Sequence, residues 1–195
     1  MDFLKLKSIN KFDCDILPFL GVLLVKEVNQ MNIESIFSEN DIRKVISTYG
    51  DTVYKIAFSY CKSHADAEDI YQDVFTKYFQ HAVMFESKTH EKAWLIRVTI
   101  NCSKSFLRSS WHKRIILLKD YQEEAVFMED NNDLLNAVLE LPMKYREVIH
   151  LYYYEGYSTK EIASILNRRD TTIRTQLQRG RDILKLKLKE DLSYE

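Results

Sequence analysis

Glycine and proline are scarce in this sequence, with four glycines and two prolines among 195 residues. Strand-rich folds need many tight turns, and those turns draw heavily on these two residue types. No run of alternating apolar and polar residues bounded by turn residues is present either. These absences argue against β structure, and we expect an all-α fold class.

Cysteine is also sparse, and Cys14, Cys61 and Cys102 are scattered without the spacing of metal ligands. An odd number of isolated cysteines suits a reducing compartment, where thiols stay free. We therefore expect a cytoplasmic protein with no metal site, in which the cysteines fill apolar space.

Long apolar runs are missing, because the longest one, residues 16–25, has about half the length that crosses a bilayer. It could form the core of a signal peptide, but no small-residue cleavage site follows it. The codons for residues 26–28 can form a purine-rich ribosome-binding sequence shortly before Met31. We hypothesise that translation naturally begins at Met31, so that residues 1–30 are a leader within an N-terminal extension of residues 1–38.

Groupings typical of catalysis are missing as well. The sequence contains no paired catalytic carboxylates, no glycine-rich phosphate loop and no nucleophile with a neighbouring base. We expect no enzymatic activity, no cofactor and no small-molecule substrate.

The most informative segment that is present is residues 156–189. Ser158 and Glu161 form a capping box that predicts a short helix, and Asp170 can cap a second helix. That second helix has an apolar face that includes Ile173 and Leu177. The pattern indicates a helix-turn-helix.

Positive charge is concentrated in this segment. Residues 168–189 contain eight Lys or Arg and two Asp, in a chain whose formal net charge is −1. Such concentration suits a surface that follows phosphates, and arginine or glutamine early in the second helix can read base edges. The alternative is an ordinary surface helix with a solvated basic face. The candidate DNA-binding residues here are Arg168, Arg169, Thr171, Thr172, Arg174, Thr175, Gln178 and Arg179.

The preceding regions also read as helices. Residues 40–61 have helical apolar spacing, and Ser63 with Asp66 predicts the start of a helix that runs to about residue 81. The outer face of that second helix is acidic. It is either a solvated face or a docking surface for a basic protein. Its members are Asp66, Glu68, Asp69, Gln72 and Asp73.

A loop is expected at residues 83–89, followed by a helix from about His90 to Arg114. Its apolar side includes Trp94, and a separate polar and basic stripe suits a nucleic-acid backbone. The stripe consists of Arg97, Asn101, Lys104 and Arg108.

The composition turns acidic between residues 115 and 133, which indicates a flexible acidic linker. We therefore predict two small helical domains, residues 39–114 and 134–195, joined by this linker.

Four segments together resemble the bacterial extracytoplasmic-function group of RNA polymerase sigma factors, over about residues 40 to 189. They are ADAEDIYQDVFTKYF (65–79), AWLIRVTINCSKSFLR (93–108), LPMKYREVIHLYYYEGYSTKEIASIL (141–166) and TTIRTQLQRGRDILK (171–185). Any one of these segments is suggestive, and their order along one chain makes the resemblance specific.

This resemblance implies partners for each surface. The first domain would be sigma region 2, whose acidic face, with Phe75, docks on the clamp of core RNA polymerase. A pocket at Phe85, Glu86, Ser87 and Lys88 would hold a base flipped from the minus-ten promoter element. The basic stripe of residues 97–108 would hold the DNA backbone there.

The second domain would be sigma region 4, placed near the polymerase flap. Arg174, Thr175, Gln178 and Arg179 would read the minus-thirty-five element, and Arg168 and Arg169 would contact phosphate. The linker would enter the positively charged cleft and RNA exit path of the polymerase. The resemblance also implies an anti-sigma factor, which in this family can be anchored in the membrane, and a role in a stress or envelope response.

The sequence departs from the family pattern at Thr171, where glycine is common, at Gln176, where arginine or lysine is common, and at the turn of residues 167–169. These departures affect the expected promoter sequence. Two rival functions stay open: a helix-turn-helix regulator without polymerase specificity, which would need a dimer, and a sigma mimic that sequesters an anti-sigma protein, which would not need Arg174, Gln178 and Arg179.

Overall fold

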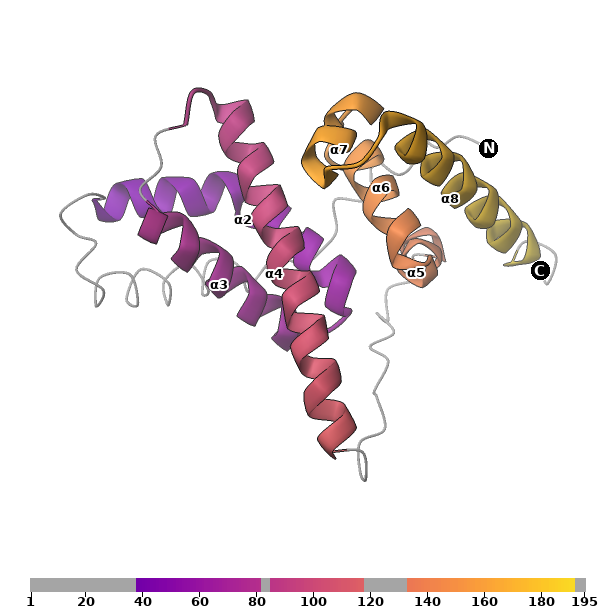
Figure 1. The fold of residues 1–195 in the computed structure, drawn as a ribbon, viewed down its shortest axis with the longest axis horizontal. Coiled ribbons are helices and arrows are strands. Elements are labelled where there is room, and N and C mark those ends of the chain that lie inside the picture. Colours follow the sequence, from indigo (N-terminus) through magenta and orange to yellow (C-terminus); the bar gives the residue numbers. More distant parts are fainter. Residues whose placement is uncertain (1–37, 82–84, 118–132, 192–195) are drawn as a thin grey trace. The chain divides into compact units, whose positions relative to one another are not determined.

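The computed structural model describes residues 38–81, 85–117 and 133–191. Within these ranges the chain forms seven helices and no strand, which confirms the predicted all-α class (Figure 1). The predicted start at Met31 and most of the predicted acidic linker lie outside the described residues. The exact domain boundaries stay a prediction.

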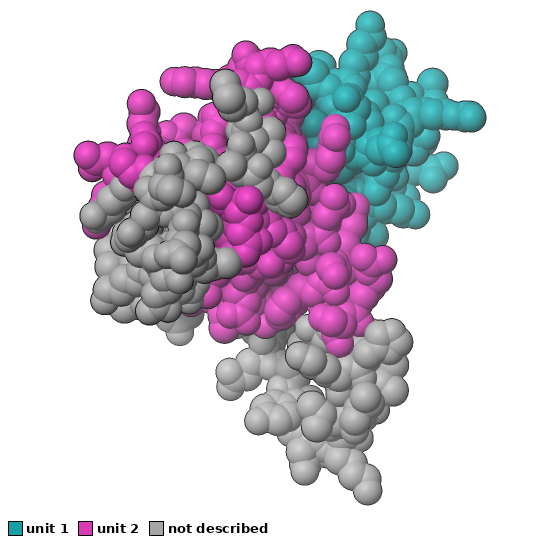
Figure 2. Space-filling model, turned by 60° about the vertical axis from the view of Figure 1, so that its left-hand side comes forward, with its two compact units in different colours: residues 1–11, 125–195 teal, residues 12–124 magenta. Residues whose placement is uncertain are grey.

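The chain divides into two compact units, which Figure 2 distinguishes by colour. Unit 2, residues 12–124, contains α2 (Glu39–Cys61), α3 (His64–His81) and α4 (Lys88–Leu117). Unit 1 includes residues 125–195 and contains α5 (Asp133–Glu140), α6 (Met143–Tyr153), α7 (Thr159–Leu166) and α8 (Asp170–Asp191). Two small helical domains were predicted, and this division confirms them.

The helix starts in unit 2 are fixed by serine side chains. Ser38 and Asp41 form a capping box at α2. The hydroxyl of Ser63 accepts from the N–H of Asp66 at 3.3 Å, as the sequence predicts for α3. Ser87 does the same for His90 at 3.1 Å, so α4 begins at Lys88, two residues before the predicted start. Each of these bonds satisfies an N–H that the helix itself cannot pair.

The core of unit 2 is aromatic. Phe58, Tyr71, Phe75 and Phe79 are at most 1% exposed, and the rings of Tyr71 and Phe75 lie 4.8 Å apart. They come from α2 and α3, while α4 adds buried aliphatic side chains such as Leu95. Large aromatic side chains bury much apolar surface at little entropic cost, which allows three helices to form a stable core.

A glutamate joins all three helices of unit 2. Glu91 of α4 accepts hydrogen bonds from the hydroxyl of Tyr49 in α2, at 2.7 Å, and from the hydroxyl of Tyr78 in α3. Burial, and next Glu91, raise the pKa of Tyr78, so its hydroxyl stays a donor at neutral pH. The half-buried carboxylate therefore has a partner on each neighbouring helix.

In unit 1 the helix-turn-helix forms as predicted. Ser158 and Glu161 make the expected capping box at α7. Asn167 ends α7 with φ of 51°, a left-handed conformation that asparagine tolerates. Asp170, predicted as the cap of the second helix, is instead the first residue of α8, and the carbonyl of Arg169 accepts from the N–H of Ile173 at 3.2 Å. The turn is one residue shorter than the sequence pattern indicates.

One ion pair fixes this turn to helix α6. The guanidinium of Arg168 pairs with the carboxylate of Glu147 in α6, whose side chain is 2% exposed. The same guanidinium donates to the side-chain oxygen of Gln176 in α8 at 3.3 Å. Because a buried carboxylate is costly without a cation, this arrangement constrains where the turn can lie.

Gly50 in the middle of α2 is explained by a close approach. A Cβ built at this position would lie 2.8 Å from the hydroxyl oxygen of the buried Tyr71. We predict that Gly50→Ala lowers the free energy of unfolding by about 1 to 2 kcal/mol, because overpacking outweighs the helix propensity gained. Chemical denaturation of the full chain would measure this change. In the Tyr71→Phe background the same substitution should be neutral or stabilising, and an equal loss in both backgrounds would contradict the explanation.

Arg168→Ala tests the ion pair. We predict a loss of about 3 to 5 kcal/mol of stability in unit 1, because Glu147 would stay buried without that cation. Hydrogen exchange of the amides in α6 and α8 would report it. Arg169→Ala is the matched control, since Arg169 is exposed and its loss should change stability by less than about 0.5 kcal/mol. Adding Glu147→Gln to Arg168→Ala should restore part of the protection.

Candidate nucleic-acid interface

The first half of the recognition helix α8 has a buried apolar face and an exposed polar face. Ile173, Leu177 and Leu184 are buried at 4% exposure or less. The predicted reading residues lie on the exposed side, where the side chain of Arg174 is 63% exposed. The exposed residues of this face are Thr171, Thr172, Arg174, Thr175, Gln178 and Arg179.

Arg174 and Gln178, two of these exposed side chains, make local contacts within α8. Arg174 pairs with Asp170 at 2.9 Å, and the amide of Gln178 donates to Asp182 at 3.0 Å. Exposed pairs one helical turn apart contribute only a few tenths of a kcal/mol. A base edge or phosphate can therefore replace these contacts at little cost.

The two arginines of the turn, Arg168 and Arg169, have different environments. Arg169 is exposed, in keeping with a phosphate contact, whereas Arg168 is committed to Glu147 and Gln176. Arg168 therefore has an internal role that the sequence did not indicate, and its phosphate contact stays a prediction. The carboxylate that holds it lies 21 residues earlier in the chain, at a position that no local pattern identifies.

A pocket of about 310 Å³ lies between the start of α6 and the start of α8. Lys144 and Tyr145 line it from α6, and Thr172, Thr175 and Arg179 are among the residues that line it from α8. Sequence reasoning missed the two α6 residues. The signal available was that both follow Pro142 in the first turn of a helix, where anions are favoured.

In unit 2 the stripe predicted on α4 lies on the surface. Arg97, Asn101 and Arg108 are exposed, and Lys104 is half-buried with its Nζ 5.9 Å from the ring centre of Tyr60. These side chains recur every three to four residues and so share one side of the helix. Trp111 and the basic residues that follow it have side chains outside the described part of the structure.

The loop before α4 carries an aromatic cluster. Phe85 is half-buried, with its ring parallel to Tyr78 at 5.8 Å and 5.6 Å from the ring of Trp94. Glu86, Ser87 and Lys88 are exposed beside it. Of the four predicted pocket residues, Phe85 packs against Tyr78 and Trp94, and the other three are exposed next to it.

The acidic face of α3 is also where the sequence predicts it. Asp69 and Asp73 are exposed, and Asp66, Glu68 and Gln72 are partly exposed. Phe75 is different, because it is completely buried in the core and cannot contact a partner. Its helical spacing already directs it inward, and only the family resemblance placed it among the docking residues.

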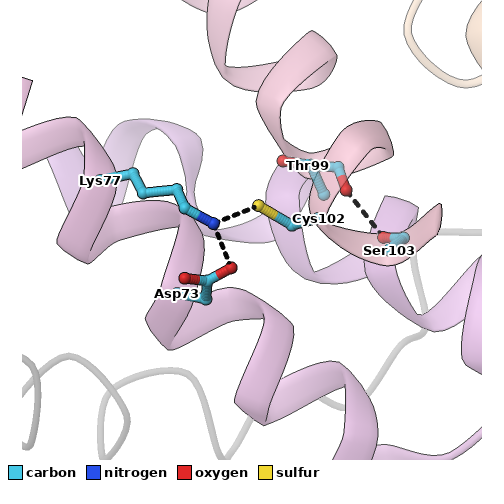
Figure 3. A network of polar contacts seen from close by, with 5 residues as sticks. All are labelled: Asp73, Lys77, Thr99, Cys102 and Ser103. Atoms are coloured by element: carbon cyan, nitrogen blue, oxygen red, sulfur yellow. Dashed lines mark hydrogen bonds and ion pairs between the residues drawn. The ribbon is translucent and has the colours of Figure 1, made fainter. Parts of the chain in front are cut away.

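Asp73 belongs to a polar network that crosses to α4 (Figure 3). The ammonium of Lys77 lies 2.5 Å from the Asp73 carboxylate and 3.2 Å from the sulfur of Cys102. Burial raises the pKa of the Cys102 thiol, so the sulfur stays neutral at physiological pH. In the next residue of α4, the Ser103 hydroxyl donates to the carbonyl of Thr99 at 2.8 Å.

Two negative findings concern the described residues only. None of the helices in the described ranges is both long and apolar enough to cross a membrane. Among the same residues, no group of three or more His, Cys, Asp and Glu side chains is placed to hold a metal ion.

Comparison with known proteins assigns both units to one family. Residues 45–113 match the family model for sigma-70 region 2, and residues 131–184 match the model for sigma-70 region 4. The RNA polymerase sigma factor SigV of Bacillus subtilis is 31% identical over 154 residues, which are 76% of this chain and 92% of that protein. The extracytoplasmic-function sigma factor SigW of the same species is 27% identical over 164 residues, 75% of this chain and 88% of that protein.

The fold is shared with a solved structure, the sigma factor RpoE of Bartonella quintana in complex with the anti-sigma factor NepR. The TM-score is 0.62 at 24% identity, and the match covers 76% of this chain and 97% of that one. The chain therefore belongs to the extracytoplasmic-function group of the sigma-70 family, and it is an alternative sigma factor that directs RNA polymerase to promoters.

Proposed function

We propose that this sigma factor divides promoter recognition and polymerase binding among three separate surfaces. The observation that carries the proposal is the segregation of charge on exposed faces. The face of α3 is acidic, while the stripe of α4 and the first turns of α8 are basic and polar. Opposite charges speed encounters and fix orientation, so an acidic face suits a basic protein surface and the others suit DNA.

In unit 1 the first turns of α8 enter the major groove of the minus-thirty-five element. Arg174 has two donors that can bond both acceptors of a guanine edge, and the amide of Gln178 can donate to an adenine edge and accept from it. Thr175 lies between them in the sequence. The exposure of these side chains and the weakness of their local contacts support this role. Arg169 contacts the adjoining backbone.

In unit 2 the start of α4 receives the minus-ten element. Phe85 in its aromatic cluster offers a face on which an unstacked base can lie, and Ser87 and Lys88 are exposed beside it. Extruding a base costs a few kcal/mol, which stacking and backbone contacts must offset. Arg97, Asn101, Lys104 and Arg108 supply the backbone contacts.

The acidic face of α3 docks on the clamp of core polymerase. Asp69 is the strongest candidate, because it is exposed, whereas the carboxylate of Asp73 already pairs with Lys77. Unit 1 lies near the flap, and the acidic segment between the units follows the basic path of the polymerase. A protein that works on polymerase and chromosome acts in the cytoplasm.

We further propose control by an anti-sigma factor. In a solved structure with this fold, the sigma factor RpoE is bound to the anti-sigma factor NepR. In another, at a TM-score of 0.55, CnrH is bound to the cytosolic domain of CnrY. An anti-sigma protein that covers the polymerase-binding or DNA-binding faces would keep this chain inactive until a stress or envelope signal releases it.

Arg174→Ala tests the recognition helix. We predict that it weakens promoter binding by about 1 to 3 kcal/mol and relaxes preference at one base pair, while affinity for core polymerase is unchanged. Run-off transcription of fragmented genomic DNA by the reconstituted holoenzyme would first define the promoter. Binding would then be measured on that promoter and on its single-base variants. Equal loss on all variants would contradict base reading by Arg174.

The series Asp69→Asn and Asp69→Lys tests the docking face. We predict a graded fall in the association rate with core polymerase, larger for lysine and larger at low salt, because the attraction is electrostatic and screened. Stopped-flow binding at several salt concentrations would measure the rate. Binding of region 4 to DNA should be unaffected, and an unchanged association rate would remove Asp69 from the docking face.

A further inference from the structure

The pocket between α6 and α8 has the composition of an anion site. It is lined by two cations, Lys144 and Arg179, and by the hydroxyl-bearing side chains of Tyr145, Thr172 and Thr175, among others, and by no carboxylate. Lys144, Thr172, Thr175 and Arg179 are exposed. A space of about 310 Å³ is ample for a phosphate group with its water.

The two cations converge on one hydroxyl. Arg179, and after it Lys144, lower the pKa of the Tyr145 hydroxyl by stabilising negative charge on its oxygen. The Nζ of Lys144 also lies 4.9 Å from the centre of the Tyr145 ring. Lys144 and Arg179, which lie 35 residues apart in the sequence, therefore both favour negative charge at this oxygen.

Two helix starts reinforce the positive potential. Lys144 and Tyr145 are the second and third residues of α6, and Thr172 is the third residue of α8. The first turn of a helix has N–H groups without intrahelical partners and the positive end of the dipole. Both helices are long enough for this effect, and both open on the pocket.

The pocket adjoins the reading face of α8. Thr175 belongs to both, and Arg179 lies one turn further along on the same side as Thr175. When α8 occupies a major groove, the phosphates that border the groove lie beside its reading face, which the pocket adjoins. A phosphodiester is thus the anion that the proposed function brings to the pocket.

We propose that this pocket binds one backbone phosphate of the minus-thirty-five promoter DNA, with Lys144 and Arg179 as its cations and Tyr145 and Thr172 as hydroxyl donors. The proposal rests on the proposed function of α8. It gives Arg179 a different role from Arg174, because Arg179 positions the helix on the backbone while Arg174 reads a base. The phosphate contact sets the register of α8 and carries no sequence information.

The test uses the holoenzyme and its promoter duplex. Lys144→Ala should lower affinity about eightfold at 0.1 M salt and reduce the slope of log K against log salt by about 0.9, the value for one phosphate contact. Arg179→Ala should act in the same way on every minus-thirty-five variant. Tyr145→Phe removes only the hydroxyl and should give a smaller, sequence-independent loss.

Chemical neutralisation of single phosphates locates the contact. On duplexes with one methylphosphonate, the loss caused by Lys144→Ala should vanish at one position and persist at all others. Lys185→Ala is the matched control, because Lys185 is an exposed lysine of α8 outside the pocket. Its effect should not depend on any single phosphate.

The outcomes separate the pocket from the wider function. A wild-type holoenzyme that starts no transcripts would refute the proposed function. A wild-type holoenzyme that selects promoters while Lys144→Ala binds with unchanged affinity and salt slope would refute the pocket alone. Loss of preference at one base pair in Arg179→Ala would return Arg179 to base reading and overturn the assignment. Binding of inorganic phosphate in the pocket, with no effect of any methylphosphonate, would also overturn it.

Discussion

A carboxylate removed from water must find partners on neighbouring elements, and each unit is held together at such a point. In unit 2, Glu91 accepts from tyrosines of α2 and α3. In unit 1, Glu147 pairs with Arg168 in the turn before the recognition helix. Leaving the buried Glu147 unsatisfied would cost several kcal/mol, which is a large part of the stability of a small domain, and the cost is smaller for the half-buried Glu91. The helices are thus placed by polar satisfaction as well as by apolar burial.

This constraint explains how a short helix-turn-helix presents α8 in a defined orientation. The turn is limited by the left-handed Asn167 and by Arg168, which reaches both α6 and α8. Because the loop between α7 and α8 is fixed at both ends, the orientation of α8 is defined even though its N-terminal residues are exposed. A reading surface needs side chains that are accessible on a support that does not move.

Local patterns in the sequence predict much of this structure, and long-range contacts account for the rest. The capping residues Ser63, Ser158 and Glu161 are recognisable because both partners lie within three residues. The exposed faces of α3, α4 and α8 follow from helical periodicity. The internal role of Arg168 and the pocket at Lys144 depend on residues 21 to 35 positions apart, so no local pattern reveals them. Phe75 shows the reverse case, in which periodicity was right and the family resemblance misled.

The aromatic cluster before α4 has a spectroscopic consequence. Both tryptophans of the chain, Trp94 and Trp111, belong to unit 2, whereas unit 1 has tyrosine as its only strong chromophore. Trp94 is half-buried against Phe85 and Tyr78, so its emission responds to changes at the start of α4. Fluorescence excited at the red edge of the tryptophan absorption band therefore reports on unit 2 and not on unit 1. The intact chain therefore has an intrinsic fluorescent probe in the unit that matches sigma-70 region 2.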